Sequence, residues 1–488
     1  MITLLLVAVP LAGCLVVLLA PVRLATVLGV VVTAATLAVA VGMAVMFDYG
    51  RTGMRLSLDV AWIRPIDLRF HLGVDGVSLP LVVLTALLCL LCAIYTARPQ
   101  GQADRPRALV ALLLLTEVGM LGTFVALDLL LFFVFFEIVL VPMYAVIAGW
   151  GTGPGRTAAA RQFILYTLLG SGVLLVGLLV IYVQTSTLDM VALAARGGAG
   201  LGHAVQVIAF VLVAGGLAVK VPMWPLHTWL PDAHTEAPTV GSVLLAGVLL
   251  KMGTYGMIRI AVPVLPEGAA ACAPLLGAFG VIGIVYAALA CLGQRDLKRL
   301  IAFSSVGHMG FVLLGIATLT PVGINAALFG NIAHGLITGL LFFVAGGIAQ
   351  RYGGTAHLGG GLLAGAPRLG ALLVVASVAS LGLPGLAGFW GEMLAMLSAF
   401  QPDARLDRGL YLGFLGVAGI GAVLTAAYFL VMLRRVAQGP AGGAPVPDVT
   451  GREWVVWTPL LVLVIVAGLW ARPVLGVTDG AVRALLGA

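Results

Sequence analysis

The chain has 488 residues, of which 61% are hydrophobic and only 9% are charged, and its formal net charge is +7. Soluble domains carry about 25% charged residues, so this composition excludes a soluble enzyme and predicts a polytopic helical membrane protein. The positive charge is spread over short loops without a basic run or a basic–aromatic stripe, which argues against a nucleic-acid partner.

The first apolar run covers residues 2–21. It has no charged segment before it and no clear small-residue cleavage motif after it. We therefore expect a retained membrane span here and not a removed signal peptide.

Successive apolar runs predict an all-α fold with about 14 transmembrane helices. Their ranges are 2–21, 24–47, 77–97, 107–127, 129–149, 161–184, 204–231, 238–262, 273–293, 296–319, 323–350, 369–400, 409–436 and 452–472. Two of these runs contain helix breakers. The seventh carries Pro222, Pro225 and Pro231 just after Lys220, and the twelfth contains the sequence LGLPG at 381–385. Proline removes a backbone donor and glycine loosens the turn, so we expect helices 7 and 12 to be broken.

The spacing of the two broken runs predicts an internal repeat. They lie five spans apart, and each is the fourth in a block of five. Because five is odd, the second block must enter the membrane from the opposite side, which is the arrangement of inverted repeats. The predicted divisions are helices 1–3 in residues 1–106, a first repeat in 107–262, a second repeat in 263–436, and helix 14 with a tail in 437–488.

Basic residues are more frequent in one set of loops than in the other. If the N-terminus lies outside, the richer set lies inside; it includes Arg98, Arg105, Arg107, Arg295, Lys298, Arg299, Arg434, Arg435 and Arg452. Positive residues favour the inside of the membrane, so we predict that both termini lie outside.

The cysteines do not predict a redox or metal centre. All five fall in apolar runs, and the Cys89–Cys92 pair has neither a second pair nor a histidine beside it. We expect small packing residues. The sequence has no iron–sulfur, dinucleotide or P-loop pattern, so we expect no cofactor and no metal on this chain, and any associated redox chemistry would take place on other chains.

Ionisable residues within the predicted spans point to proton movement. The chain has only three lysines among its 26 basic residues, and Lys220 and Lys251 follow apolar runs. Buried lysine can release its proton, whereas arginine cannot. The other groups at membrane depth are Glu117, Glu137, His308, His334 and Glu392. Such groups are costly in a membrane and usually mark ion or proton paths, so we predict a relay in which Glu137 is the partner of Lys220.

Each of these groups also has a structural interpretation. A Glu137–Lys220 pair could hold two helices together, Lys251 could extend toward a membrane surface, and the two histidines and Glu117 could be satisfied packing residues. A second set of polar groups lies near the end of the broken seventh run, where a solvated loop is at least as good an interpretation as proton uptake: His227, Asp232, His234 and Glu236.

Five motifs resemble those of the antiporter-like subunits of respiratory complex I. They are FHLGVDGVSLP at 70–80, FFEIVLVPMY at 135–144, KVPMWPLHTWLPDAH at 220–234, DLKRLIAFSSVGHMG at 296–310 and GFWGEM at 388–393. The resemblance extends over about residues 65–435. Within the family it is nearest to the subunit M branch of bacterial NADH–quinone oxidoreductase, the counterpart of mitochondrial chain 4, because Glu392 stands where the sibling subunits L and N resemble one another in having lysine.

The resemblance implies a role for each matching residue. Glu137 and Lys220 would form the paired switch of a first half-channel, Lys251 the connecting residue, and Glu392 the terminal residue of a second half-channel. His308 and His334 would belong to a central hydrophilic axis, with Glu117 beside the first half.

The resemblance also implies partners and a location. The chain would sit in the bacterial inner membrane among other membrane-arm subunits, especially L and N, while FMN, iron–sulfur clusters and quinone would be bound by partner subunits. Quinone reduction elsewhere in the complex would drive proton translocation. Three alternatives stay open on the residues alone: an Mrp-type cation/proton antiporter subunit, a membrane subunit of a membrane-bound hydrogenase, and a scaffold that only holds other subunits.

Overall fold

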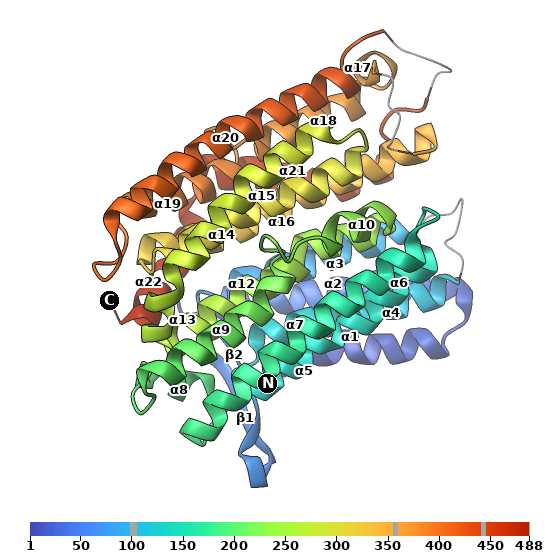
Figure 1. Cartoon of the computed structure of the whole chain (residues 1–488). Coiled ribbons are helices and arrows are strands. Elements are labelled where there is room, and N and C mark those ends of the chain that lie inside the picture. The colour runs from blue at the N-terminus through green and yellow to red at the C-terminus, as the bar shows by residue number, and fades with distance from the viewer. Residues whose placement is uncertain (98–104, 355–359, 441–445, 488) are drawn as a thin grey trace.

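The computed structural model describes residues 1–97, 105–354, 360–440 and 446–487 as a bundle of long helices (Figure 1). Within these ranges, 13 helical segments are long and apolar enough to cross a membrane. The twelfth predicted run supplies a further crossing as two shorter helices. The predicted all-α polytopic fold is therefore confirmed, while Arg98 of the basic loops lies outside the described residues.

The observed crossings follow the predicted runs to within several residues. The helices are α1 Ile2–Leu19, α2 Val22–Met46, α3 Leu79–Thr96, α4 Pro106–Val125, α5 Leu129–Ile138, α6 Leu140–Trp150, α7 Arg156–Thr185, α9 His203–Lys220, α11 Thr239–Leu244, α12 Leu250–Gly256, α13 Val262–Val264, α14 Pro266–Gly293, α15 Leu297–Ala317, α16 Pro321–Tyr352, α18 Pro367–Ser380, α19 Gly388–Phe400, α20 Arg408–Val436 and α21 Gly451–Leu469. The shorter elements are α8 Met190–Arg196, α10 Trp229–Glu236, α17 Leu362–Gly365, α22 Arg472–Leu486, and the strands β1 Arg55–Ile63 and β2 Leu68–Val74.

The crossing formed by α11 to α13 lies at the centre of the bundle. Every residue in the most apolar stretch of this crossing is buried inside the protein. The crossing contacts α9 of the first half of the chain and α16 of the second half. Two π-helical segments, Leu245–Leu249 and Met257–Ala261, interrupt it. Such segments are rare and are frequently found at functional sites. Lys251 lies between them.

Both predicted helix breaks are present. α9 ends at Lys220, and the chain turns before α10 begins at Trp229. The indole Nε1 of Trp229 donates to the Val219 carbonyl at 3.0 Å, which satisfies a group that the end of the helix leaves free. The second break separates α18 from α19. There Gly382 has φ +73°, a left-handed conformation that favours glycine.

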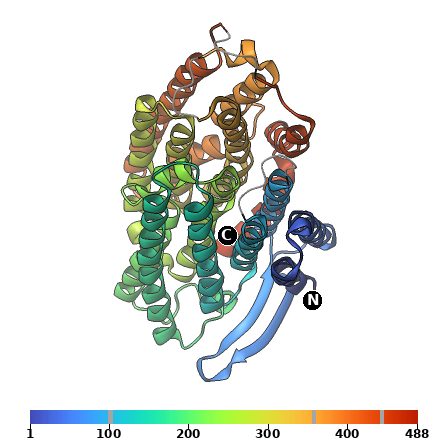
Figure 2. The ribbon, with the colours of Figure 1, turned by 90° about the vertical axis from the view of Figure 1, so that its right-hand side faces the viewer.

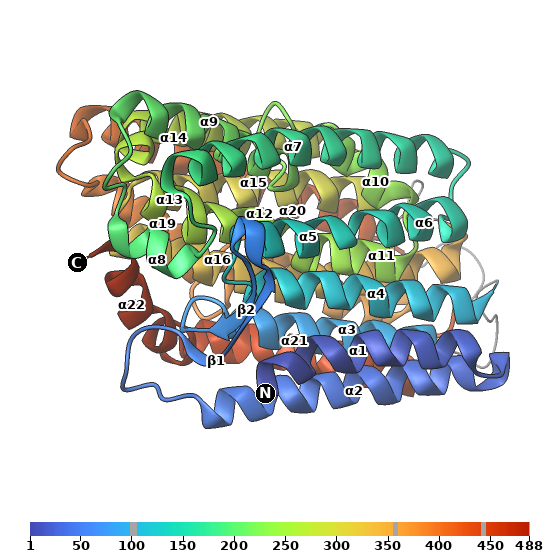
Figure 3. The same ribbon diagram turned by 90° about the horizontal axis from the view of Figure 1, so that it is seen from below.

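A β-hairpin and a C-terminal helix outside the spans were not predicted from the sequence. β1 and β2 pair as an antiparallel hairpin, with Val60 opposite Phe70, that projects from the bundle (Figure 2). The segment after the last span forms α22, which lies with α8 at one end of the bundle (Figure 3). There Thr478 Oγ1 donates to Asn325 Oδ1 at 2.6 Å, so α22 is fixed to the start of α16.

Close backbone approach positions α19 against α16. A Cβ placed on Gly391 would lie 2.7 Å from the Cα of Gly330, so the contact leaves no room for a side chain. The adjacent residue, Glu392, is thereby held at the interior face of α19, where it is 9% exposed.

A buried line of proton-exchanging side chains

Lys220 occupies the C-terminal end of α9 and is 3% exposed. Its Nζ donates to the carbonyl oxygen of Phe136 at 2.9 Å and lies 3.3 Å from the centre of the Phe136 ring. The negative end of the α9 dipole, a carbonyl and an aromatic face all favour a cation at this position. The break in α9 therefore places the Lys220 ammonium against dipoles and an aromatic ring, which stabilise its charge only in part because no carboxylate of the described residues contacts it.

Glu137 is the neighbour of Phe136 in α5. No direct ion pair joins its side chain to that of Lys220, and Oε1 of Glu137 is buried without a hydrogen-bond partner. Lys220 thus contacts the residue next to Glu137, but the predicted ion pair between Glu137 and Lys220 is not formed.

Lys251 contacts the second half of the bundle. Its Nζ lies 2.6 Å from Nδ1 of His334 on α16 and also donates to the carbonyl of Ala246 in the first π segment. Lys251 is completely buried and His334 is 5% exposed. Because Nδ1 accepts from the ammonium, a neutral His334 carries its proton on Nε2. That nitrogen is buried and has no partner.

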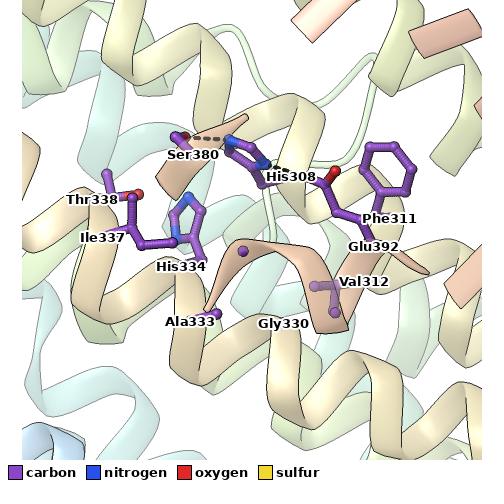
Figure 4. Close-up of a pocket in the computed structure, with 12 residues that line it drawn as sticks. His308, Phe311, Val312, Gly330, Ala333, His334, Ile337, Thr338, Ser380 and Glu392 are labelled. Carbon is purple, nitrogen blue, oxygen red and sulfur yellow. Dashed lines mark hydrogen bonds and ion pairs between the residues drawn. The ribbon is translucent and has the colours of Figure 1, made fainter. Parts of the chain in front are cut away.

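His308 on α15 continues the line toward Glu392 (Figure 4). Its Nδ1 lies 2.9 Å from Oε1 of Glu392, and its Nε2 lies 2.8 Å from Oγ of Ser380, the last residue of α18. The second helix break thus supplies both partners, one from each side of the break. The His308 and His334 rings are 5.7 Å apart between centroids.

A small cavity lies among these residues. His308, His334, Ser380 and Glu392 are among the side chains that line its volume of about 30 Å³. A water molecule needs roughly 10–15 Å³ of such space, so the cavity has space for about two. A water there would connect the unpartnered Nε2 of His334 with the His308–Glu392 pair.

Glu117 lies apart from this line. It is buried on α4, with 0% solvent exposure, and neither of its carboxyl oxygens has a hydrogen-bond partner. The structure therefore does not bring Glu117 into contact with the other predicted residues, and its role stays a prediction.

The polar residues after the first break divide into two kinds. Asp232 is 40% exposed and forms an ion pair with Arg299 at 2.8 Å, as expected of a solvated surface. His234 is completely buried, stacks on Phe342 with ring centres 4.7 Å apart, and has no partner for either nitrogen. We assign His234 to the interior, against the interpretation of this segment as a solvated loop. The sequence around His234 contains no pattern that predicts this burial.

A buried ion pair lies near one end of the central crossing. Arg259 Nη2 lies 2.5 Å from Oδ1 of Asp75, and both side chains are buried. Arginine keeps its proton, so this pair provides a constant charge and not a relay member. Over the residues that the structure describes, no group of three or more His, Cys, Asp or Glu side chains is arranged to hold a metal ion.

The fold and the buried line together define a proton-antiporter-like membrane protein. The family model described as "NADH:quinone oxidoreductase/Mrp antiporter, TM" matches residues 126–414. The chain belongs to this family, as the resemblance predicted.

Sequence relatives support the same assignment. The chain is 38% identical over 439 residues to NADH-quinone oxidoreductase subunit M of Rhodobacter capsulatus, covering 87% of this chain and 83% of the relative. It is 43% identical over 435 residues to NAD(P)H-quinone oxidoreductase chain 4 1 of Synechococcus sp. (strain JA-3-3Ab), covering 87% and 81%.

Solved structures show the same fold. A chain of respiratory complex I from Thermus thermophilus with bound NADH matches with a TM-score of 0.88 and 30% identity, covering 100% of both chains. A chain of the Mrp complex from Dietzia sp. DQ12-45-1b matches with a TM-score of 0.87 and 23% identity, covering 99% of this chain and 97% of that one. The second likeness concerns the fold alone.

Proposed function

We propose that this chain translocates protons as a membrane-arm subunit of a redox-driven NADH–quinone oxidoreductase. The observation that carries the proposal is the buried sequence Lys251, His334, His308 and Glu392, whose members come from four different helices and all can exchange a proton. The relatives named as subunit M and chain 4 support the redox-driven version.

The geometry suggests how a proton passes along the line. The ammonium of Lys251 gives a proton to Nδ1 of His334, and the resulting imidazolium releases the proton on Nε2 into the cavity. A water in the cavity would pass it to the Ser380 hydroxyl, which gives its own proton to Nε2 of His308, and His308 then gives the proton on Nδ1 to the Glu392 carboxylate. Imidazole suits this task because it accepts a proton on one nitrogen and releases one from the other.

Lys220 and Glu137 would supply the energy-dependent step. An open pair leaves the ammonium less compensated than a closed one, so opening favours release of the proton into the centre of the bundle. Moving one charge against a membrane potential costs about 2.3 kcal/mol per 100 mV. Making and breaking one partly buried ion pair is of that order.

The proposal includes partners, cofactors and location. The sibling subunits L and N would flank this chain in a bacterial inner membrane, with both termini outside. FMN, iron–sulfur clusters and quinone would belong to other subunits, so this chain would contribute translocation and no redox chemistry to the enzyme complex.

Inside-out membrane vesicles containing the assembled complex test this function. We expect NADH oxidation to acidify the vesicle interior, and this acidification to be lost when Lys251 is changed to Met. Assembly is checked by the amount of complex on a native gel. If an imposed sodium gradient moves protons through the chain without NADH, the Mrp-type antiporter is the correct assignment. If K251M leaves pumping intact, the chain is a scaffold.

A further inference from the structure

A large cavity lies at the end of the bundle that carries the basic loops. It is half open to the surface and bounded by the end of α14, the start of α15 and the end of α20, and its volume is about 670 Å³. It is separate from the buried line of proton-exchanging residues. None of the groups assigned to proton movement lines it.

The rim of this cavity is positively charged. Arg295 and Arg435 line it, and both are exposed. Arg435 Nη1 donates to the carbonyl of Gln294 at 3.4 Å, which holds this guanidinium beside the α14–α15 turn. Asp296 also lines the cavity, but its Oδ1 accepts the backbone N–H of Arg299 at 2.9 Å as the cap of α15. The two guanidinium groups therefore outweigh one carboxylate that is already engaged.

Part of the cavity wall is apolar. Leu292, Val431 and Met432 line it. From there, exposed apolar side chains continue along α14 and α20 away from the loops, including Leu289 and Leu430, which are 56% and 57% exposed. Within a membrane, such faces contact acyl chains. The cavity therefore joins a cationic rim to a lipid-facing surface.

We propose that this cavity binds the headgroup of an anionic phospholipid, with the acyl chains lying along α14 and α20. Arginine binds phosphate through two parallel hydrogen bonds and keeps its charge. Basic cavities between transmembrane helices are suited to anionic headgroups, and basic side chains near the membrane surface attract them. A free phosphate would use only the rim, whereas a phospholipid also covers the apolar wall and the exposed faces below it.

Photo-crosslinking in the assembled complex tests the proposal. The probes are phosphatidylglycerol and phosphatidylcholine that carry the same photoactivatable group near the start of one acyl chain. Labelled residues are mapped by mass spectrometry. We expect phosphatidylglycerol to label the 428–436 segment of α20 about tenfold more than phosphatidylcholine, since two basic side chains contact the headgroup.

Matched variants test whether the charges of Arg295 and Arg435 are needed for lipid binding. R295Q/R435Q should reduce labelling by phosphatidylglycerol to the level of phosphatidylcholine, while R295K/R435K should retain most of it. R434Q is the control, because Arg434 is the exposed neighbour of Arg435 and does not line the cavity. Native gels confirm that each variant assembles.

Several outcomes would overturn the proposal. Equal labelling by the two lipids would show that only ordinary boundary lipid occupies this face. Unchanged labelling in R295Q/R435Q would show that the guanidinium groups do not bind the headgroup. Loss of labelling on addition of inorganic phosphate alone would identify a free-phosphate site, and absence of labelling of this segment by either lipid would show that no lipid occupies it.

Discussion

Nζ of Lys251 lies 2.6 Å from Nδ1 of His334, although the two residues are 83 positions apart in the chain. The contact joins the central crossing to α16 and therefore connects the two predicted repeats. Both groups are shielded from solvent, so a proton exchanged between them stays within the protein.

Replacing His334 with Gln should stop transfer across this contact. Gln can accept a hydrogen bond from Lys251, but it cannot take up and release a proton. We expect the rate of NADH-driven proton uptake to fall at least about tenfold, since a positioned proton-transfer group contributes typically 10²–10⁴-fold. The control is H203Q, because His203 is exposed and pairs with Glu267 at the surface. Equal pumping by H334Q and the parent chain would remove His334 from the path.

The His308–Glu392 pair offers a comparison with a surface pair of the same type. Its two atoms are 2.9 Å apart and shielded, whereas His203 and Glu267 are 3.0 Å apart and exposed. We expect E392Q to reduce pumping at least about tenfold, because the amide keeps the hydrogen bond from His308 but cannot hold the proton. E392D should give an intermediate rate, and E267Q should pump normally. A fully active E392Q complex would contradict the assignment.

Gly391 tests whether the α16–α19 approach positions Glu392. Replacement by Ala puts a methyl group against Gly330, and overpacking of this kind typically costs about 1–3 kcal/mol. We expect a lower temperature of thermal unfolding and weaker pumping in G391A. The matched control is G413A, since nothing lies within 4 Å of a Cβ at Gly413 on α20. If both variants unfold at the same temperature, the close approach does not determine stability.

The hairpin junction should respond to acid. His71 Nδ1 lies 3.2 Å from Oδ2 of Asp189. Burial raises the pKa of Asp189, but the His71 imidazole and the Ala192 N–H outweigh burial and hold this pKa below its ordinary value. An acid with a lowered pKa in the folded state stabilises the fold above its unfolded pKa of about 4 and loses this contribution as pH falls below it.

Hydrogen exchange measures this junction directly. After correction for the intrinsic rate, we expect protection of the Leu127 amide, which donates to the His71 carbonyl, to decrease below a pH of about 4. D189N should show less protection at neutral pH and little further change on acidification. A pH response in D189N as large as that of the parent chain would assign the effect to another group.

The sequence predicted the crossings and the breaks well because both follow from local chemistry. Long apolar runs specify spans, and Pro222 and the LGLPG segment specify breaks. Lys220, Lys251 and Glu392 stood out because a charge in an apolar run is costly anywhere in a membrane.

The partners of these residues were harder to predict. His334 meets Lys251, and His308 meets Glu392, only through the packing of helices that are distant in the chain. Neither π segment beside Lys251 contains a proline, although Pro263 follows the second one. The burial of His234 likewise depends on Phe342 of α16, which no local pattern around residue 234 indicates.

The measurement that tests the central claim most directly is NADH-driven proton uptake by vesicles containing the Lys220→Arg complex, with electron transfer measured beside it. Arginine keeps the positive charge at the end of α9 but cannot release its proton. The control is Lys298→Arg, because Lys298 is buried near the surface loops and donates to the Ala237 carbonyl at 3.0 Å. The account predicts that the K220R complex assembles and loses pumping while K298R retains it. Unchanged pumping by K220R would show that Lys220 is only a fixed charge and would contradict the account.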